Sequence, residues 1–323
     1  MKSQIITSLL FMAYCVLGAE EPTAQLTFKV TEESGKPIRQ VPVNVHLFDS
    51  AKSEIGHPVY NVTNSLTDND GIAVVRGSNL TREFSYGIWG VAGYYREGGV
   101  YYFDYSTNSQ WQPWNPTINM VLRPVLNPTP MYARAVETRI PKPNEKFGFD
   151  LMAADWVAPL GKGKTADLFF QLSGYAESIT NYDSTLTVSF ANRLDGIRGF
   201  VPFKGSQFRS PREAYIDGYQ PQLELRRVGK PGQMSSEWIE PSSIQTNYFF
   251  RIRTELDENG NIKSAFYGKI YGNFDFFGAA TKGSYLTIPT YYLNPEPNSR
   301  NMEFDPKRNL FGRLPSLQEV RDP

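Results

Sequence analysis

Apolar side chains recur at every second position through the first third of the chain. Leu26, Phe28 and Val30 share one face of an extended segment. The next segment repeats the pattern with Val41, Val43, Val45 and Leu47, and places Asn44 and His46 on the opposite face, which we expect to be the wetter one. Such alternation between turns is typical of strands with one buried face. About seven short strands before residue 123 predict a β-sandwich.

The rest of the chain also shows strand patterns. Residues 168–172 are apolar enough for a central strand, and residues 248–256 and 263–271 are joined by a turn that contains Asn259-Gly260, a strong hairpin signal. Only residues 316–319, with the spacing of a capping box, predict a short helix. The Pro-rich segment 125–130 lacks either pattern and predicts an extended linker.

Four short motifs in the first third carry a family resemblance. They are residues 35–37 (Gly-Lys-Pro), 67–71 (Thr-Asp-Asn-Asp-Gly), 93–95 (Gly-Tyr-Tyr) and 120–124 (Met-Val-Leu-Arg-Pro). With the alternating valines, they make residues 24–124 resemble the carboxypeptidase-regulatory-like domain. The resemblance implies a transthyretin-like sandwich that acts as a spacer or docking module without chemistry of its own. The segment 106–116 departs from the family pattern as an insertion.

We therefore expect an all-β protein of two β-sandwich domains. The first, residues 24–124, is transthyretin-like or Ig-like, and the second, residues 131–323, is larger and jelly-roll-like. The sequence patterns of the second domain resemble those of uncharacterised exported bacterial proteins, and this resemblance implies no function.

The first residues predict export. Lys2 precedes an uncharged apolar stretch, residues 5–17, and small residues Gly18 and Ala19 follow, which is the order of a secretory signal peptide, here residues 1–19. Its removal would take away Cys15, the single cysteine, and with it any disulfide or thiol chemistry. We expect the periplasm, the cell surface or the extracellular space, and no transmembrane segment after signal removal.

Charge and histidine content exclude several function classes. Lys plus Arg equals Asp plus Glu, 33 each, whereas nucleic-acid binders carry a basic excess. The two histidines, His46 and His57, both precede the second domain, so a histidine-based triad there is excluded. Residues 161–165 (Gly-Lys-Gly-Lys-Thr) resemble the end of a phosphate-binding loop, but the first glycine is missing and no helix pattern follows, so an exposed turn is the better interpretation. We expect no cofactor.

Acidic residues offer two further kinds of site. Two turns place oxygen ligands at alternate positions as calcium loops do, with Asp68 and Asp70 in one and Asp257 and Asn259 in the other, although turns need the same residues. A glycosidase needs only a pair of carboxylates. The second domain offers many such acids, among arginines that would equally form surface salt bridges with them: Asp150, Asp155, Asp167, Glu177, Asp183, Asp195, Glu213 and Asp217.

Aromatic clusters late in the first domain are the strongest binding candidates. Neighbouring rings on one strand point to opposite faces, so one ring of each pair should be exposed. We expect these rings either to bind a glycan or another envelope protein, or to pack against the second domain, an alternative that we slightly favour for the two tryptophans. The candidates are Tyr94, Tyr95, Tyr101, Tyr102, Trp111 and Trp114.

The main interpretation is thus an exported, non-catalytic binding or structural component of the cell envelope. One alternative is a carbohydrate-active enzyme that uses a carboxylate pair in the second domain. The other is a surface assembly subunit with an unpaired strand edge. The sequence does not determine the ligand or the oligomeric state.

Overall fold

The computed structural model describes residues 21–48, 59–178, 180–233, 237–239, 247–277 and 283–323. The predicted signal peptide, including Cys15, and His57 lie outside these ranges. The chain divides into two compact units. Unit 1 contains residues up to Ala92 together with Arg96–Leu122, and unit 2 contains Gly93–Tyr95 and Arg123–Pro323.

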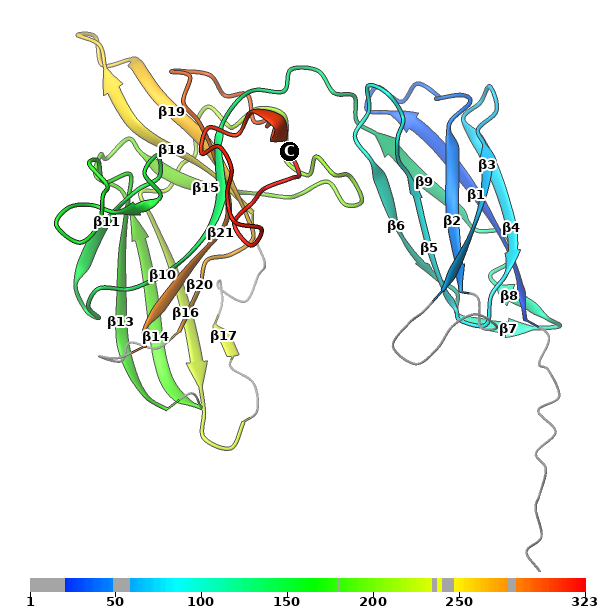
Figure 1. Ribbon diagram of the computed structural model, residues 1–323, viewed down its shortest axis with the longest axis horizontal. Coiled ribbons are helices and arrows are strands. Elements are labelled where there is room, and N and C mark those ends of the chain that lie inside the picture. The colour runs from blue at the N-terminus through cyan, green and yellow to red at the C-terminus, as the bar shows by residue number, and fades with distance from the viewer. Residues whose placement is uncertain (1–20, 49–58, 179, 234–236, 240–246, 278–282) are drawn as a thin grey trace, which may run out of the picture. The chain divides into compact units, whose positions relative to one another are not determined.

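The described residues are all-β, as predicted, and Figure 1 shows strands throughout both units. The one helical element among them is a single 3-10 turn, Pro306–Arg308. The predicted helix at residues 316–319 is wrong: the amides of Gln318 and Glu319 both donate to the carbonyl oxygen of Pro315, which closes one isolated turn. No helix in the described part of the chain has the length and apolar character to span a membrane.

Unit 1 is a sandwich of two sheets (Figure 1). The β1 sheet has the order β4-β1-β8-β7, with β9 also paired to β1. Its strands are β1 (Thr23–Glu32), β4 (Ile72–Ser78), β7 (Tyr105–Thr107), β8 (Gln110–Gln112) and β9 (Thr117–Leu122). The β2 sheet has the order β3-β2-β5-β6. Its strands are β2 (Pro42–Phe48), β3 (Tyr60–Leu66), β5 (Glu83–Ile88) and β6 (Glu97–Tyr102).

The alternating apolar residues fill the space between these sheets. Leu26, Phe28 and Val30 are at most 1 % exposed, and so are Val43 and Val45 on the facing sheet. The rings of Phe28 on β1 and Tyr86 on β5 lie 5.3 Å apart, which joins the two inner faces. The inner faces thus follow the period-2 pattern of the sequence.

Unit 2 also contains two sheets, each with six strands in the described residues. The β21 sheet has the order β10-β21-β19-β18-β15, with β20 also paired to β21. Its strands are β10 (Tyr132–Arg139), β15 (Gly196–Phe200), β18 (Asn247–Leu256), β19 (Ile262–Tyr271), β20 (Asp275–Phe277) and β21 (Tyr285–Asn294). The hairpin of β18 and β19 is the one that the Asn-Gly turn predicted.

The β14 sheet of unit 2 has the order β12-β11-β13-β14-β16-β17. Its strands are β11 (Lys146–Asp150), β12 (Asp155–Trp156), β13 (Leu168–Ser178), β14 (Asn181–Ser189), β16 (Gln222–Gly229) and β17 (Glu237–Ile239). Strand β13 is central, as its apolar sequence predicted. A large core that includes Phe170, Phe250 and Leu286 lies between the sheets.

The second face of the β21 sheet is covered as well. Phe249, Tyr271 and Tyr292 pack there in a separate core with Phe304 and Val320 from the C-terminal segment. The β21 sheet is therefore enclosed on both faces, which allows it to hold polar side chains far from water.

Candidate functional site: an aromatic face on unit 1

The outer face of the β1 sheet is mostly polar. Register pairs Thr27 with Val74 and Thr117, and Lys29 with Asn119, so these side chains share the face. Lys29, Arg76, Thr117 and Asn119 are exposed. Val74 and Val121 are the large apolar side chains exposed there. This composition is ordinary for a solvated sheet face.

The outer face of the β2 sheet has the opposite character. The register of β2 with β3 pairs Phe48 with Tyr60 and His46 with Val62, and the register of β5 with β6 pairs Ser85 with Val100. Six large apolar side chains on this face are between 41 % and 53 % exposed, and we call them, with Phe48 and His46, the aromatic face: Tyr60, Val62, Leu66, Trp89, Val100 and Tyr102. A single-domain surface seldom exposes so many together unless something binds there.

Four rings form a row across the aromatic face. Consecutive ring centroids lie 5.9 Å apart for Phe48–Tyr60, 6.4 Å for Tyr60–His46 and 5.5 Å for His46–Trp89. Neighbouring planes are inclined by 57° to 69°. His46 does point outward as predicted, but it lies among rings, so the expectation of a wetter face there is wrong.

A glycine lets one of these rings lie close to the sheet. A Cβ atom added at Gly87 would be 2.9 Å from Cζ3 of Trp89, so a side chain there would push the indole away. The Trp89 side chain packs over Gly87 and remains 44 % exposed. The absence of a side chain at Gly87 thus leaves room for the indole of Trp89 against the sheet.

The predicted aromatic candidates fall into three different environments. Tyr102 is 53 % exposed on the aromatic face, whereas Tyr101 turns the other way and contacts Phe103 with ring centroids 4.9 Å apart. Tyr95 is buried in unit 2 and Tyr94 is half-buried. One ring of the 101/102 pair therefore faces outward, as strand alternation requires.

The two tryptophans of the insertion were expected to pack on the second domain, on a partner or on a sugar, and for Trp111 this is wrong. Trp111 lies on β8 and is 8 % exposed within unit 1, where its Nε1 donates to the carbonyl oxygen of Asn79 at 2.9 Å. Its ring also contacts Phe103 at 6.1 Å. Trp114 is half-buried, with the guanidinium of Arg76 5.6 Å from its ring centre. Trp111 thus completes the core of its own unit.

Both candidate calcium loops are turns in which an aspartate oxygen accepts hydrogen bonds from backbone amides. Oδ1 of Asp68 accepts hydrogen bonds from the amides of Asp70 and Ile72. Oδ1 of Asp257 accepts from the amides of Asn259 and Asn261, and these bonds hold its pKa below the usual value. Within the described ranges, no group of three acidic or histidine side chains has a geometry that could hold a metal ion.

Three of the candidate catalytic acids in unit 2 surround a bulge in β18. Asp150 lies 3.5 Å from the guanidinium of Arg253, and Asp167 binds the same group at 2.7 Å. Asp195 accepts from the amides of Arg253 and Thr254. Arg253 has a φ of 53°, which is strained for a side chain of this size, and the three acids fix that conformation.

The pKa values of two of these acids move apart. Burial raises the pKa of Asp167, even though Arg253 opposes the shift. Burial also acts to raise the pKa of Asp150, but hydrogen bonds from four amides, those of Lys164 and Thr165 first, hold it below its usual value. Divergent values are expected of a catalytic pair. Here, however, both oxygens of each acid already accept from protein donors, so the acids are structural.

The segment 161–165, which resembles a phosphate-binding loop, binds carboxylates of the chain itself. The amide of Lys162 donates to Asp155, and the amides of Lys164 and Thr165 donate to Asp150, all at 2.9 to 3.1 Å. Consecutive amides that converge on an anion form the same kind of nest that binds phosphate elsewhere.

Other candidate acids form ion pairs at the surface. The pairs are Asp183 with Arg226, Glu213 with Arg300 and Asp217 with Arg198.

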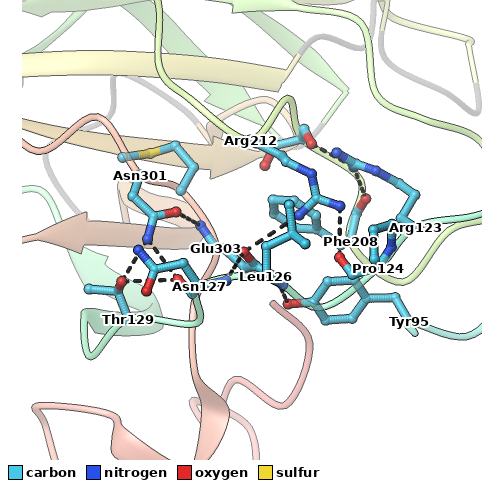
Figure 2. Close-up of polar contacts among 12 residues, drawn as sticks. Tyr95, Arg123, Pro124, Leu126, Asn127, Thr129, Phe208, Arg212, Asn301 and Glu303 are labelled. Atoms are coloured by element: carbon cyan, nitrogen blue, oxygen red, sulfur yellow. Dashed lines mark hydrogen bonds and ion pairs between the residues drawn. The ribbon is translucent and has the colours of Figure 1, made fainter. Parts of the chain in front are cut away.

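A buried carboxylate, that of Glu303, organises a second polar cluster in unit 2 (Figure 2). Its two oxygens accept from the amides of Leu126 and Asn127, each at 2.8 Å, and from the hydroxyl of Tyr95 at 2.7 Å. Arg212 lies 3.5 Å away. The segment predicted as a linker, residues 125–130, is thus bound along the body of unit 2, a role that no local sequence pattern indicated.

Lys269 is wholly buried beside this cluster. Its Nζ donates to the carbonyl oxygen of Met302, to Oγ of Ser210 and to the hydroxyl of Tyr271. Burial, and then the charges of Arg123 and Arg209, hold its pKa well below the usual value. Three protein acceptors surround the nitrogen, and Ser210 and Tyr271 are buried with it, so this arrangement is a structural network.

Surface cavities offer less than the aromatic face. One of about 510 Å³ lies beside Glu32, Lys36 and Arg39 in unit 1. Another of about 420 Å³ lies beside Arg209, Tyr292 and Asp322 in unit 2. Their walls mix both signs of charge and bring together no aromatic cluster or catalytic set.

Comparisons with known proteins do not assign the chain to a family. No family model matches it, and no curated protein matches it. Among solved structures, chlorocatechol 1,2-dioxygenase from Pseudomonas putida is 10% identical over 32% of this chain and 61% of its own, less than two thirds of its length, with a TM-score of 0.26. The shaft pilin of Lactobacillus rhamnosus GG is 10% identical over 80% of this chain and 95% of its own, with a TM-score of 0.24.

A third similar structure is the major pilin subunit of Bacillus cereus, 11% identical over 74% of this chain and 66% of its own, with a TM-score of 0.22. Superpositions at this level transfer neither an activity nor an assembly role. The functional argument therefore rests on the chain's own surfaces.

Proposed function

We propose that the chain is an exported, non-catalytic component of the cell envelope that docks a protein partner through the aromatic face of unit 1. The observation that carries the proposal is the contrast between the two outer faces of one sandwich. The β1 sheet presents Lys29, Arg76 and Asn119 to water, whereas the β2 sheet presents Tyr60, Trp89 and Tyr102. Exposed apolar surface is unfavourable in water, and binding removes that cost.

The ring geometry supports a protein partner over a glycan. A platform for successive sugars presents ring faces in a common plane, but neighbouring rings in this row are inclined by 57° to 69°. Aliphatic Val62, Leu66 and Val100 occupy much of the remaining face. Tyrosine and tryptophan among aliphatic side chains are typical of the centres of protein interfaces.

We also propose that unit 1 is a carboxypeptidase-regulatory-like domain, which would make it a docking module. Its two-sheet architecture and the Asp68–Gly71 turn that precedes β4 support this assignment. The aromatic face lies on β2, β3, β5 and β6, and so belongs to the body of the domain and not to the inserted segment 106–116.

Photo-crosslinking in cells that produce the protein tests the docking proposal. The photoreactive analogue p-benzoylphenylalanine is introduced at Tyr102 on the aromatic face and, as the matched control, at exposed Asn119 on the opposite outer face. We expect irradiation to give discrete protein adducts from position 102 and none from position 119. Equal yields from both positions, or no adduct from either, would show that the aromatic face docks no protein.

A further inference from the structure

The aromatic face carries almost no charge. Among the outward-facing residues of β2, β3, β5 and β6, Glu83 at one corner is the single Asp, Glu, Lys or Arg. A partner with a charged surface would therefore find no complementary charge, and its own charges would be desolvated without compensation. An identical face meets no such penalty, because neither copy repels the other.

The size of the face suits a symmetric dimer. Six large side chains that are each about half exposed amount to on the order of 500 Å² of apolar surface. Two such faces in contact would bury about 1,000 Å² in total, which reaches the lower bound for a specific interface. The same surface contributed by both copies is what a two-fold axis requires.

Apolar side chains also extend across the whole face. The two edge strands carry Tyr60 and Val62 on β3 and Val100 and Tyr102 on β6. Between them, the central strand β2 contributes Phe48 and His46 to the row of rings. A two-fold rotation that stacks two such faces therefore brings apolar side chains of each copy onto those of the other, as sheets pack face to face in sandwiches.

We infer that the partner of the aromatic face is a second copy of this chain, bound sheet to sheet through β2, β3, β5 and β6 about a two-fold axis. The inference rests on the proposed docking function and identifies the protein that docks. In the dimer, the rings of Tyr60, Trp89 and Tyr102 are buried between the copies.

Paired lysine substitutions on the purified full chain test this inference by sedimentation velocity. Val62→Lys places a charge on the aromatic face, and Val74→Lys places the same charge on an exposed valine of the other sheet. The two valines are closely matched, at 51 % and 46 % exposed on the edge strands β3 and β4. Val100→Lys repeats the test on β6, the opposite edge of the face.

The expected result is a dimer in the micromolar range for the wild type and for Val74→Lys. Val62→Lys and Val100→Lys should weaken dimerisation by about 100-fold, because like charges are brought together in an apolar contact. Circular dichroism melting of each variant checks that the sandwich is intact. A wild-type dimer that both face variants leave unchanged would overturn the inference.

The crosslinking experiment separates failure of the inference from failure of the docking function. Adducts from position 102 that consist of this chain alone support self-association. A monomeric wild type whose position-102 adducts contain a different protein would refute the dimer and leave the docking function standing. A monomeric wild type without adducts would refute both.

Discussion

Unit 1 and unit 2 depart from the usual distribution of side chains in opposite directions. Unit 1 exposes Tyr60, Trp89 and Tyr102 to water on one sheet face, whereas unit 2 encloses Glu303 and Lys269 at no more than 2 % exposure. Both arrangements cost free energy by themselves. In unit 2 the chain supplies the compensation, since Glu303 accepts from two amides and a hydroxyl. Among the described residues of unit 1, the exposed rings of the aromatic face have no comparable compensation, and this difference separates a structural cluster from a binding surface.

The buried acid should show the largest effect on stability. Glu303→Ala leaves the amides of Leu126 and Asn127 and the hydroxyl of Tyr95 without their acceptor and the neighbouring Arg212 without its counter-ion. We expect a loss of about 4 kcal/mol in the free energy of unfolding, measured by urea titration. Glu303→Gln, which keeps one acceptor oxygen, is the control and should lose less. A loss below about 1 kcal/mol for the alanine variant would mean that the cluster is dispensable.

A buried ring in unit 1 provides the next test. Trp111→Ala removes a core indole and its hydrogen bond to Asn79, so we expect a loss of about 3 kcal/mol. Thermal melts of the purified variants measure this loss. Trp114→Ala, at the half-buried neighbour, should lose less than half as much stability in the same experiment. Equal losses would contradict the assignment of Trp111 to the core.

Asp150, one of the acids around the β18 bulge, predicts a pH dependence. Because the pKa of Asp150 is lowered in the folded state, its contribution to stability is complete above the pKa of the unfolded carboxyl, about 3.9, and is lost as the pH falls through the folded pKa. At pH 7, Asp150→Asn should lose about 2 kcal/mol, and the difference from wild type should shrink as the pH falls below about 4. Asp183→Asn, which removes an exposed pair with Arg226, should lose under about 1 kcal/mol. A difference that does not change with pH would contradict the shift.

The exposed rings should contribute least to the stability of the isolated fold. Tyr102→Ser replaces a ring that is 53 % exposed, and we expect a change within about 0.5 kcal/mol in the unfolding free energy of the monomer. The measurement is a urea titration at a concentration well below that of dimer formation. A loss comparable with that of Trp111→Ala would show that the face is part of the core.

The sequence predicted the strands better than it predicted the sites. Alternation placed Leu26 and Val43 in the core correctly, and the Asn-Gly turn located the hairpin of β18 and β19. Alternation on β3 also separates Tyr60, Val62 and Leu66 from Asn61, Thr63 and Ser65, which lie on the other face. It could not show that the apolar set points outward, because a period of two defines two faces and only the register with β2 decides which is buried.

The polar clusters could not be predicted from local sequence patterns, and the reason is different. Asp167 meets Arg253, and Glu303 meets Leu126, across large stretches of chain. Local patterns contain no signal for such pairs, so Asp167 was equally compatible with a catalytic pair, and Glu303 was not singled out at all. The burial of Trp111 depended in the same way on the distant carbonyl group of Asn79.

The pairing of β1 has a consequence for the timing of folding. This first strand lies between β4 and β9, and its parallel partner β9 is the last strand of unit 1. A chain that emerges from its N-terminus therefore lacks one neighbour of β1 until Leu122 has been made. Non-local closure of this kind slows folding, so the β1 sheet cannot be completed before the last strand of the unit is available.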